Sequence, residues 1–228
     1  LALRPVLGVS LHAATLAQAI EVCREAIRDH RPLLIGVVNA AKLVKMRHDP
    51  LLRRSVESAD LVLADGMAVV WASRILGQPL PSRVAGIDLF EHLLEVAARD
   101  GHSVYFLGAS QDVLEALLKE VSRRHPGLRV AGSRNGYFRD EQSAQVAHEI
   151  RAAHPDMLFV GMSTPKKEVF LDAWHSEMDV LVCHGVGGSF DVVAGKTRRA
   201  PVLWQRLGLE WLYRVLQEPR RMWKRYLV

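Results

Sequence analysis

The chain alternates between short runs of consecutive apolar residues and longer stretches in which apolar residues recur every three or four positions. The longer spacing, which is typical of amphipathic helices, occurs at 16–27, 89–98 and 111–124. The continuous runs end at glycine, proline or polar residues and predict short buried strands. They occupy 33–38, 61–64, 104–108, 128–132, 157–161 and 180–183.

From residue 105 onwards the predicted strands and helices follow one another in turn, which is typical of βαβ units. We therefore expect an α/β protein with a Rossmann-like, mostly parallel sheet that carries helices on both faces. The chain shows no low-complexity linker and no simple repeat. The expected anatomy is one body at 1–200, with two closely packed lobes near 1–100 and 101–200, and a C-terminal appendage at 201–228.

Two predicted strands end in a polar residue at the opening of a helix, Asn39 and Asp65. Ligands of open parallel sheets bind at the carboxyl ends of the strands. Both residues also suit a helix N-cap. For Asn39 the helix cap is the better local interpretation. For Asp65 a helix cap and a ligand-binding role are about equally supported, because Asp-Gly after an apolar strand exposes a carboxylate at a sharp turn.

Glycines recur at predicted strand ends, at Gly108, Gly132, Gly161 and Gly185, which suggests a ligand along the carboxyl edge of the sheet. The last of them opens the stretch 185–191, Gly-Val-Gly-Gly-Ser-Phe-Asp. Glycine lets backbone amides approach a ligand, and a following helix favours an anion such as a diphosphate. Asp191 is then placed to accept hydrogen bonds from ribose hydroxyls or a uracil-like edge. A tight strand-to-helix connection with a capping Asp is the alternative, since one such motif is weak evidence.

Charge is concentrated at the C-terminus. Of the net charge of +5, the segment from Lys196 onwards contributes +7, with nine Lys and Arg against two Glu, so the preceding body is slightly acidic at −2. Trp204, Trp211 and Trp223 lie among these basic residues. Such a composition suits an anionic bilayer surface, although tryptophans that pack on the body, or that stack on single-stranded nucleic acid, are alternatives. A body-wide nucleic-acid surface is not expected.

Composition limits the remaining classes of function. Apolar residues make up 49% of the 228 residues, enough for a substantial core. Cys23 and Cys183 both lie in apolar patterns, which favours reduced thiols in a cytosolic compartment. No apolar run approaches the length of about 18 residues that a membrane span needs, and no Cys or His cluster has metal-ligand spacing.

With these residues in view, the sequence resembles the WecG/TagA/CpsF glycosyltransferases, also called glycosyltransferase family 26. The resemblance runs in order along nearly the whole chain, so it is far more specific than one motif. The matching stretches are 39–43, 64–66, 83–89, Gly161 with 165–168, 185–191, 199–201, 208–214, and Glu218-Pro219 with Arg221.

The resemblance implies an inverting transfer of a sugar from a UDP-sugar to a lipid-linked acceptor at the cytoplasmic membrane face. In the family the acceptor is typically N-acetylglucosamine on undecaprenyl diphosphate, and the products feed teichoic acids, enterobacterial common antigen or exopolysaccharides. The donor sugar would be of the N-acetylmannosamine type, its uronic acid, or glucose. The family's C-terminal appendage targets the membrane and contributes arginines to the active site. The chain departs from the family at Val37 and Lys167, where Thr and Gln are frequent, a difference that would fit a subgroup with a different donor.

An inverting transferase needs a base for the acceptor hydroxyl and positive charge on the departing diphosphate. Asp65 is the candidate base, and Arg214, Arg221 and Arg83 are the candidates for the diphosphate. No Asp-x-Asp pair stands at a strand end, so we expect no metal and no other cofactor. The residues expected to bind substrate are Asn39, Gly108, Asn135, Gly161, Lys166, Lys167, Gly185, Gly187, Gly188 and Asp191.

Two other classes of protein compete with this interpretation. A nicotinamide-dependent oxidoreductase would require G-x-G-x-x-G between the first strand and helix of a βαβ unit and an acidic residue about 20 positions later. Neither 108–110 nor 185–187 meets that requirement. A non-catalytic protein that binds lipid head groups is the other alternative. The expected partners are a UDP-sugar, a lipid-linked sugar and an anionic membrane, with no nucleic acid, and the sequence allows a homo-oligomer.

Overall fold

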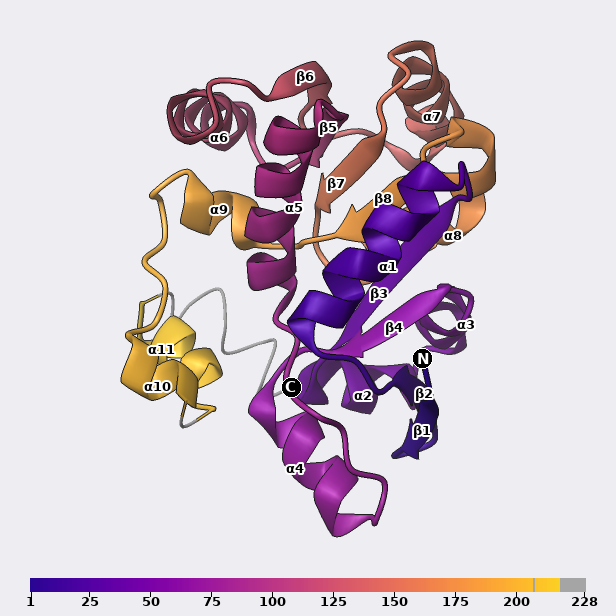
Figure 1. The fold of residues 1–228 in the computed structure, drawn as a ribbon, viewed down its shortest axis with the longest axis vertical. Helices are drawn as coiled ribbons and strands as arrows, with labels where there is room; N and C mark the ends of the chain where they lie inside the picture. The colour runs from indigo at the N-terminus through magenta and orange to yellow at the C-terminus, as the bar shows by residue number, and fades with distance from the viewer. Residues whose placement is uncertain (207, 218–228) are drawn as a thin grey trace.

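A computed structural model describes residues 1–206 and 208–217 of the chain. Its centre is a six-stranded sheet, in the order β4-β3-β8-β7-β5-β6, in which every pair of neighbours is parallel. The predicted α/β class with a parallel, Rossmann-like sheet is therefore confirmed (Figure 1). The strands are β3 (Leu33–Val38), β4 (Leu61–Ala64), β5 (Ser103–Gly108), β6 (Arg129–Arg134), β7 (Met157–Gly161) and β8 (Val182–Gly185).

Helices cover both faces of this sheet because its strands are apolar on both sides. Alternate strand residues point into two separate cores, as Leu158 and Phe159 do on β7. One core is closed by α1 (Leu16–Arg28), α5 (Gly86–Asp100), α6 (Gln111–Arg124) and α9 (Ser189–Val193), and Figure 1 shows α1 and α5 crossing in front of the sheet. The other is closed by α2 (Ala40–Met46), α3 (Pro50–Glu57), α4 (Met67–Ile75), α7 (Ser143–Ala152) and α8 (Lys166–Met178).

Local sequence explains where several helices begin and end. Thr15 caps α1 in a capping box with Gln18. Asp49 caps α3, whose first residue is Pro50. Gly101 ends α5 in the left-handed conformation that glycine adopts without steric cost. The chain's pattern of caps and breakers thus sets where these helices begin and end.

Three features differ from the sequence-based expectations. A hairpin of β1 (Leu3–Val6) and β2 (Val9–His12) lies beside β4, where His12 Nδ1 accepts a hydrogen bond from the Val62 amide at 3.0 Å, and the apolar pattern had not predicted it. Gly132 lies inside β6, so it is not a strand-end glycine as expected. A Cβ at this position would lie 2.6 Å from the Tyr105 ring, which explains the glycine by packing. The last strand runs two residues later than predicted, because β8 extends to Gly185.

The appendage begins with two short helices, α10 (Val202–Arg206) and α11 (Glu210–Gln217), whose Trp204 and Tyr213 rings pack edge to face with centroids 5.6 Å apart.

The sheet is shared by the expected lobes, since β8 pairs with β3 on one side and with β7 on the other. The division into body, lobes and appendage stays a prediction. Over the residues described, none of the helices has both the length and the apolar character that crossing a bilayer requires.

Candidate active site

All six parallel strands bring predicted site residues to one edge of the sheet. The register aligns Val38 with Ala64, Val160 with Gly185, and Gly108 with Gly161. The residues that follow these strand ends, together with the ends themselves, therefore form a continuous carboxyl edge. Along it, from β4 to β6, lie Asp65, Asn39, Gly185, Gly161, Gly108 and Asn135.

Asp65 and Asn39 are neighbours at one end of this edge. The Asp65 amide donates to the Val38 carbonyl at 2.8 Å, and a Cβ on Gly66 would lie 3.9 Å from the Asn39 Cβ. Asn39 is the N-cap of α2, since its Oδ1 accepts from the Lys42 amide at 2.9 Å. Asp65 is not the cap of α4, because Gly66 occupies that position. Asp65 is half-buried at the strand end.

Two of the strand-end glycines have a packing reason of their own. A Cβ on Gly161 would lie 2.3 Å from the ring of Phe190, which is fully buried, and a Cβ on Gly108 would lie 2.4 Å from the Gly161 carbonyl oxygen. Side chains are therefore excluded at both positions by the protein itself. Contact of these two glycines with a substrate stays a prediction.

Asn135 and Lys166 belong to the other half of the edge. Asn135 Oδ1 accepts from the Tyr137 amide at 3.1 Å and its Nδ2 donates to Gln111 at 3.3 Å. Lys166 donates to the Phe138 carbonyl at 2.6 Å and lies 4.1 Å from the centre of the Phe138 ring. Strands are spaced by about 4.8 Å, so Asn135 lies roughly 24 Å from Asp65 along the edge. The structure does not bring these two predicted site residues together.

Lys167 belongs to a buried ionic cluster with Lys42 and Glu168. Glu168 Oε1 accepts from Lys42 Nζ at 2.7 Å and also from Lys167 Nζ, and all three side chains are at least nine-tenths buried. Lys42 donates in addition to the carbonyl of Val37. Of the two positions at which the sequence departs from the family, Lys167 contributes its side chain to this cluster and Val37 only its backbone carbonyl, since the Val37 side chain packs in the opposite core.

The cluster keeps Glu168 ionised. Burial raises the pKa of this carboxyl, but the ammonium groups of Lys42 and Lys167 outweigh it and lower the pKa to about 2. The Lys167 ammonium also donates to Thr164 Oγ1 at 2.7 Å. The three groups carry two positive charges and one negative charge close to the carboxyl edge.

The stretch 185–191 connects β8 to the short helix α9. Gly187 takes a positive φ of +55°, and the amides of Val186 and Gly187 both donate to the Val160 carbonyl. Asp191 lies half-buried in the first turn of α9, where the N-cap is Gly188. The Asp191 carbonyl accepts from the amides of Lys196 and Thr197, which turns the chain towards the appendage.

Arg83 joins the appendage to the Asp65 end of the edge. The Val84 amide donates to the Ala64 carbonyl at 2.8 Å, so Arg83 lies beside the end of β4. Its guanidinium binds Glu210 of α11 at 2.7 Å and lies 3.8 Å from Asp88. Arg199 binds the same Asp88 and lies 3.6 Å from Glu210. Four charged side chains therefore hold the first turn of α11 against the body.

Gly208 makes a second contact between the appendage and the body. It has a φ of +67°, and a Cβ there would lie 2.8 Å from Met67 Cβ and 3.1 Å from the Trp71 ring. Because Met67 begins α4 directly after Asp65-Gly66, the appendage passes close to the candidate base. Arg214 lies on α11, with a side chain outside the described residues, and Arg221 lies outside them altogether.

A sequence profile described as the glycosyl transferase WecG/TagA/CpsF family matches residues 4–228. The chain belongs to the WecG/TagA/CpsF family of glycosyltransferases. Two Bacillus proteins are similar to this glycosyltransferase, and both are named N-acetylglucosaminyldiphosphoundecaprenol N-acetyl-beta-D-mannosaminyltransferase. The Bacillus spizizenii protein is 41% identical over 179 residues, 78% of this chain and 68% of the relative. The Bacillus subtilis protein is 39% identical over 172 residues, 75% of this chain and 66% of the relative. The chain thus spans about two thirds of the length of each.

The sequence did not predict the contacts of several side chains at the site of this glycosyltransferase. Lys42 and Glu168 lie within matching motifs, yet no local pattern indicates that both are buried and paired. Arg199 and Glu210 likewise gain a role only through the contact between body and appendage. Among the described residues, no group of three or more His, Cys, Asp or Glu could hold a metal ion.

Proposed function

We propose that this chain transfers a sugar from a UDP-sugar to N-acetylglucosamine on a polyprenyl diphosphate, with inversion at the anomeric carbon. The observation that carries the proposal is the half-buried Asp65 at the carboxyl edge, beside Asn39 and Arg83, in a chain that matches the glycosyltransferase family over 4–228. The names of the two Bacillus relatives support an N-acetylmannosamine-type donor and an undecaprenyl-linked acceptor. The uronic acid of that sugar and glucose are the other donors to be tested, and the products would enter cell-surface polysaccharide or teichoic acid.

The proposed chemistry begins at Asp65. Its carboxylate takes the proton of the acceptor hydroxyl while that oxygen attacks the anomeric carbon from the face opposite the leaving group. The bond between the anomeric carbon and the UDP oxygen breaks, and the electron pair leaves with the diphosphate. Attack from the opposite face inverts the configuration. The proton remains on Asp65 until solvent removes it.

The leaving diphosphate needs positive charge, and arginine can bind two of its oxygens at once. Arg214 and Arg221 of the appendage are the proposed partners, with Arg83 as a third. Arg83 forms an ion pair with Glu210, so it could bind the diphosphate only after releasing this carboxylate. If it keeps the ion pair, its role is to hold α11 in place. The loop of Gly185, Gly187 and Gly188 and the carboxylate of Asp191 are proposed to hold the nucleotide. The Gly187 amide would have to exchange its bond to the Val160 carbonyl for a phosphate oxygen.

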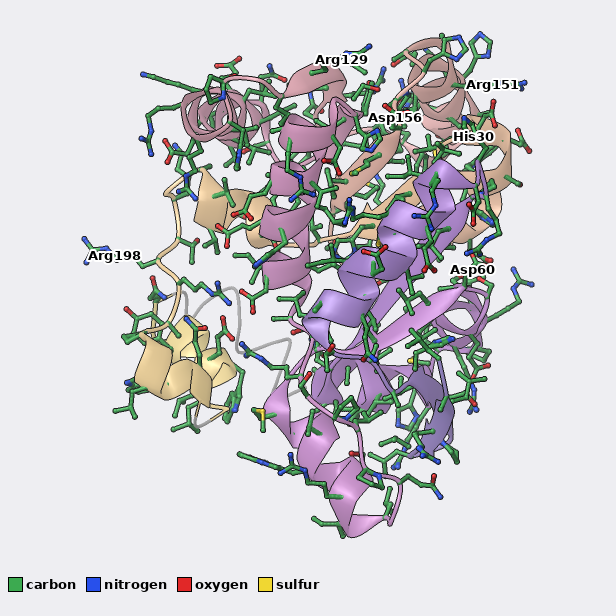
Figure 2. The ribbon with its side chains drawn as sticks, in the orientation of Figure 1. His30, Asp60, Arg129, Arg151, Asp156 and Arg198 are labelled. Atoms are coloured by element: carbon green, nitrogen blue, oxygen red, sulfur yellow. The ribbon has the colours of Figure 1, made fainter. Side chains whose placement is uncertain are left out.

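The appendage is proposed to bring the enzyme to an anionic membrane surface on the cytoplasmic side, where a polyprenyl-linked acceptor would lie. Support comes from the charge of +7 from Lys196 onwards and from the tryptophans among these residues. Figure 2 shows Arg198, in the connection that leads to α10, pointing away from the body, on the side of the molecule opposite Asp60 and Asp156. Asp60 and Asp156 lie near the amino ends of β3 and β5, where their carboxylates accept hydrogen bonds from the amides of Leu34 and Ser103.

The test is a screen of UDP-sugars against a synthetic lipid-diphosphate N-acetylglucosamine acceptor, with wild type and Asp65→Asn compared. We expect Asp65→Asn to keep its fold and its UDP affinity but to lose about 10²-fold or more in transfer, the usual scale for a general base. Near-normal turnover by Asp65→Asn would remove the residue from this role. A wild-type chain that binds UDP but transfers no sugar would favour a non-catalytic binding protein.

A further inference from the structure

The helix α4 is apolar on nearly every side. Only Ser73 and Arg74 are polar among its nine residues. One side of the helix packs in the core, and its buried residues are Val69, Val70 and Ser73. On the opposite side, exposed apolar residues recur at helical spacing, at Ala68, Trp71 and Ile75. A helix that is apolar all round is normally buried, so over the described residues the outer side of α4 is an apolar surface that stays largely uncovered.

This surface, which we call the α4 face, consists of Ala68, Trp71, Ile75 and Leu76. Ile75 is 86% exposed, Leu76 48% and Trp71 45%. Ile75 and Leu76 lie at the outer end of the helix, which Figure 1 shows projecting beyond the sheet at the bottom of the view. One exposed apolar side chain is ordinary, whereas a contiguous group of them marks a contact with a protein or with a membrane.

The elements beside α4 also expose apolar side chains. The strand β1 contacts α4, and Leu3 of this strand and Leu7 in the turn after it are exposed. The appendage passes over α4 at Gly208. Leu203 of α10 and Leu216 of α11 are each 65% exposed. The α4 face therefore adjoins two further elements that present apolar side chains to their surroundings.

Charge decides what can cover the α4 face. The appendage that passes over α4 belongs to the segment from Lys196 onwards, which carries +7. A second copy of the chain docked on this face would bring two such segments together, and like charges repel. An anionic bilayer instead attracts the positive charge and accepts apolar side chains beneath its head groups. The occupant that fits both the charge and the apolar face is a membrane.

We propose that the α4 face is a membrane-binding surface of the body, whose side chains insert among the acyl chains of an anionic bilayer beside the appendage. The inference rests on the proposed function, because it takes the acceptor to be anchored in the same bilayer. The helix spans roughly 14 Å and begins two residues after Asp65, so its insertion holds the Asp65 end of the carboxyl edge towards the membrane. The apolar contact of α4 adds to the electrostatic contact of the appendage.

The first test labels position 75 on the full chain. Ile75→Cys reacts selectively with a thiol-specific fluorophore, because the native thiols of Cys23 and Cys183 are buried. The vesicles contain phosphatidylglycerol and phosphatidylcholine with brominated acyl chains and no acceptor lipid, so they quench a label that enters the hydrocarbon. Val130→Cys is the matched control, since Val130 is exposed on β6, at the edge of the sheet opposite β4. We expect the label at position 75 to be quenched and the label at position 130 to be unaffected.

The second test replaces Ile75 by asparagine. Ile75→Asn should bind the same vesicles about tenfold more weakly, because an isoleucine side chain that leaves water is lost. The difference should persist at high salt, since salt screens the contact of basic residues and not that of an apolar side chain. Val130→Asn should bind like wild type. Thermal unfolding confirms that each variant is folded, and Ile75→Asn should turn over a water-soluble acceptor at the wild-type rate.

Equal quenching at both positions would overturn the inference, as would vesicle binding that Ile75→Asn leaves unchanged. Either result leaves the proposed sugar transfer standing. A dimer in analytical ultracentrifugation that Ile75→Asn dissociates, without any effect on vesicle binding, would identify a second copy as the occupant and also overturn the inference. A wild-type chain that binds no vesicles would overturn it together with the membrane part of the proposed function. Turnover of the water-soluble acceptor distinguishes that failure from a failure of the transfer itself.

Discussion

At the scale of single residues, His184 shows how burial controls ionisation next to the site. The ring lies in the middle strand β8, fully buried, and its Nε2 donates to the Gly86 carbonyl at 3.1 Å. Desolvation lowers the pKa of His184 to about 4, and the bond to Gly86 only partly opposes it. The imidazole is therefore neutral at pH 7. Protonation would place the added proton on Nδ1, which is buried and has no hydrogen-bond partner within the described residues.

We predict that His184 makes the protein lose stability in mild acid. A folded-state pKa below the unfolded value of 6.5 means that the stability is present above pH 6.5 and is lost as pH falls towards 4. The shift corresponds to about 3 kcal/mol of unfolding free energy by the end of this window. Urea unfolding of wild type and His184→Gln between pH 7 and 4 measures it, and we expect a flatter dependence for the variant. Parallel curves would show that other groups cause the loss.

Asp191 carries a second prediction at this scale. Asp191→Ala should weaken UDP binding by roughly 1–3 kcal/mol if the carboxylate accepts a hydrogen bond from the nucleotide. The residue lies half-buried in the first turn of α9, four positions after Gly187, so it is close to the loop that would hold the diphosphate. Calorimetry with UDP measures the loss. Unchanged affinity would return Asp191 to the role of stabilising the start of α9.

At the scale of elements, the attachment of the appendage depends on a glycine and a carboxylate. Gly208 lets the chain pass over Met67 and Trp71 of α4, and Glu210 then binds Arg83. Both contacts lie next to the end of β4, where Asp65 is. The position of α11 is therefore coupled to the candidate active site by packing and by charge.

We predict that Gly208→Ala loosens α11 from the body. The added methyl group would lie 2.8 Å from Met67 Cβ, at a backbone φ of +67° that is itself unfavourable for alanine. Limited proteolysis should then cut the chain after residue 200 several times faster, while the body keeps its thermal midpoint. Gly195→Ala is the control, because Gly195 has a similar φ of +74° and no atom within 4 Å of a built Cβ. Equal sensitivity of the two variants would assign the effect to backbone strain alone.

At the scale of the whole molecule, positive charge is concentrated at the C-terminal end. The segment from Lys196 onwards, which comprises the appendage and the five residues before it, carries +7, and residues 1–195 carry −2. Each basic group near an anionic surface contributes about 1 kcal/mol to binding, so half of them would suffice for measurable vesicle binding. Arg214 and Arg221, two of the arginines proposed for the diphosphate, belong to the same segment, which would link membrane binding to turnover.

Truncation before Gly208 should leave a folded body that neither transfers sugar nor binds anionic vesicles. Vesicle sedimentation and turnover of a water-soluble acceptor measure the two losses separately. Charge reversal at Arg220 and Lys224 should weaken vesicle binding more than chemistry, and Arg221→Ala should do the reverse. If the truncated protein turned over the acceptor at the rate of the full-length protein, the link between the appendage and catalysis would be contradicted. Equal binding of the full-length protein to neutral and anionic vesicles would contradict the electrostatic basis of membrane binding.

The sequence by itself determined the α/β class and placed all six strands of the central sheet to within about two residues. It succeeded because strands buried on both faces must be continuously apolar, so each one is visible locally. The hairpin at 3–12 escaped, since its strands are four residues long, partly exposed and interrupted by Pro5. The motifs that carry the family resemblance were also recognised from the sequence alone.

Only the tertiary structure decided which strand ends are neighbours and which charges meet. The order β4-β3-β8-β7-β5-β6 brings Asp65 beside Asn39 and leaves Asn135 at the far end of the edge. The pairing of Lys42 and Lys167 with Glu168, and of Arg83 with Glu210 across 127 positions of sequence, likewise depends on the fold. The physical reason is that hydrophobic periodicity reports which face of a segment is buried. It carries no information about the distant segment that covers this face.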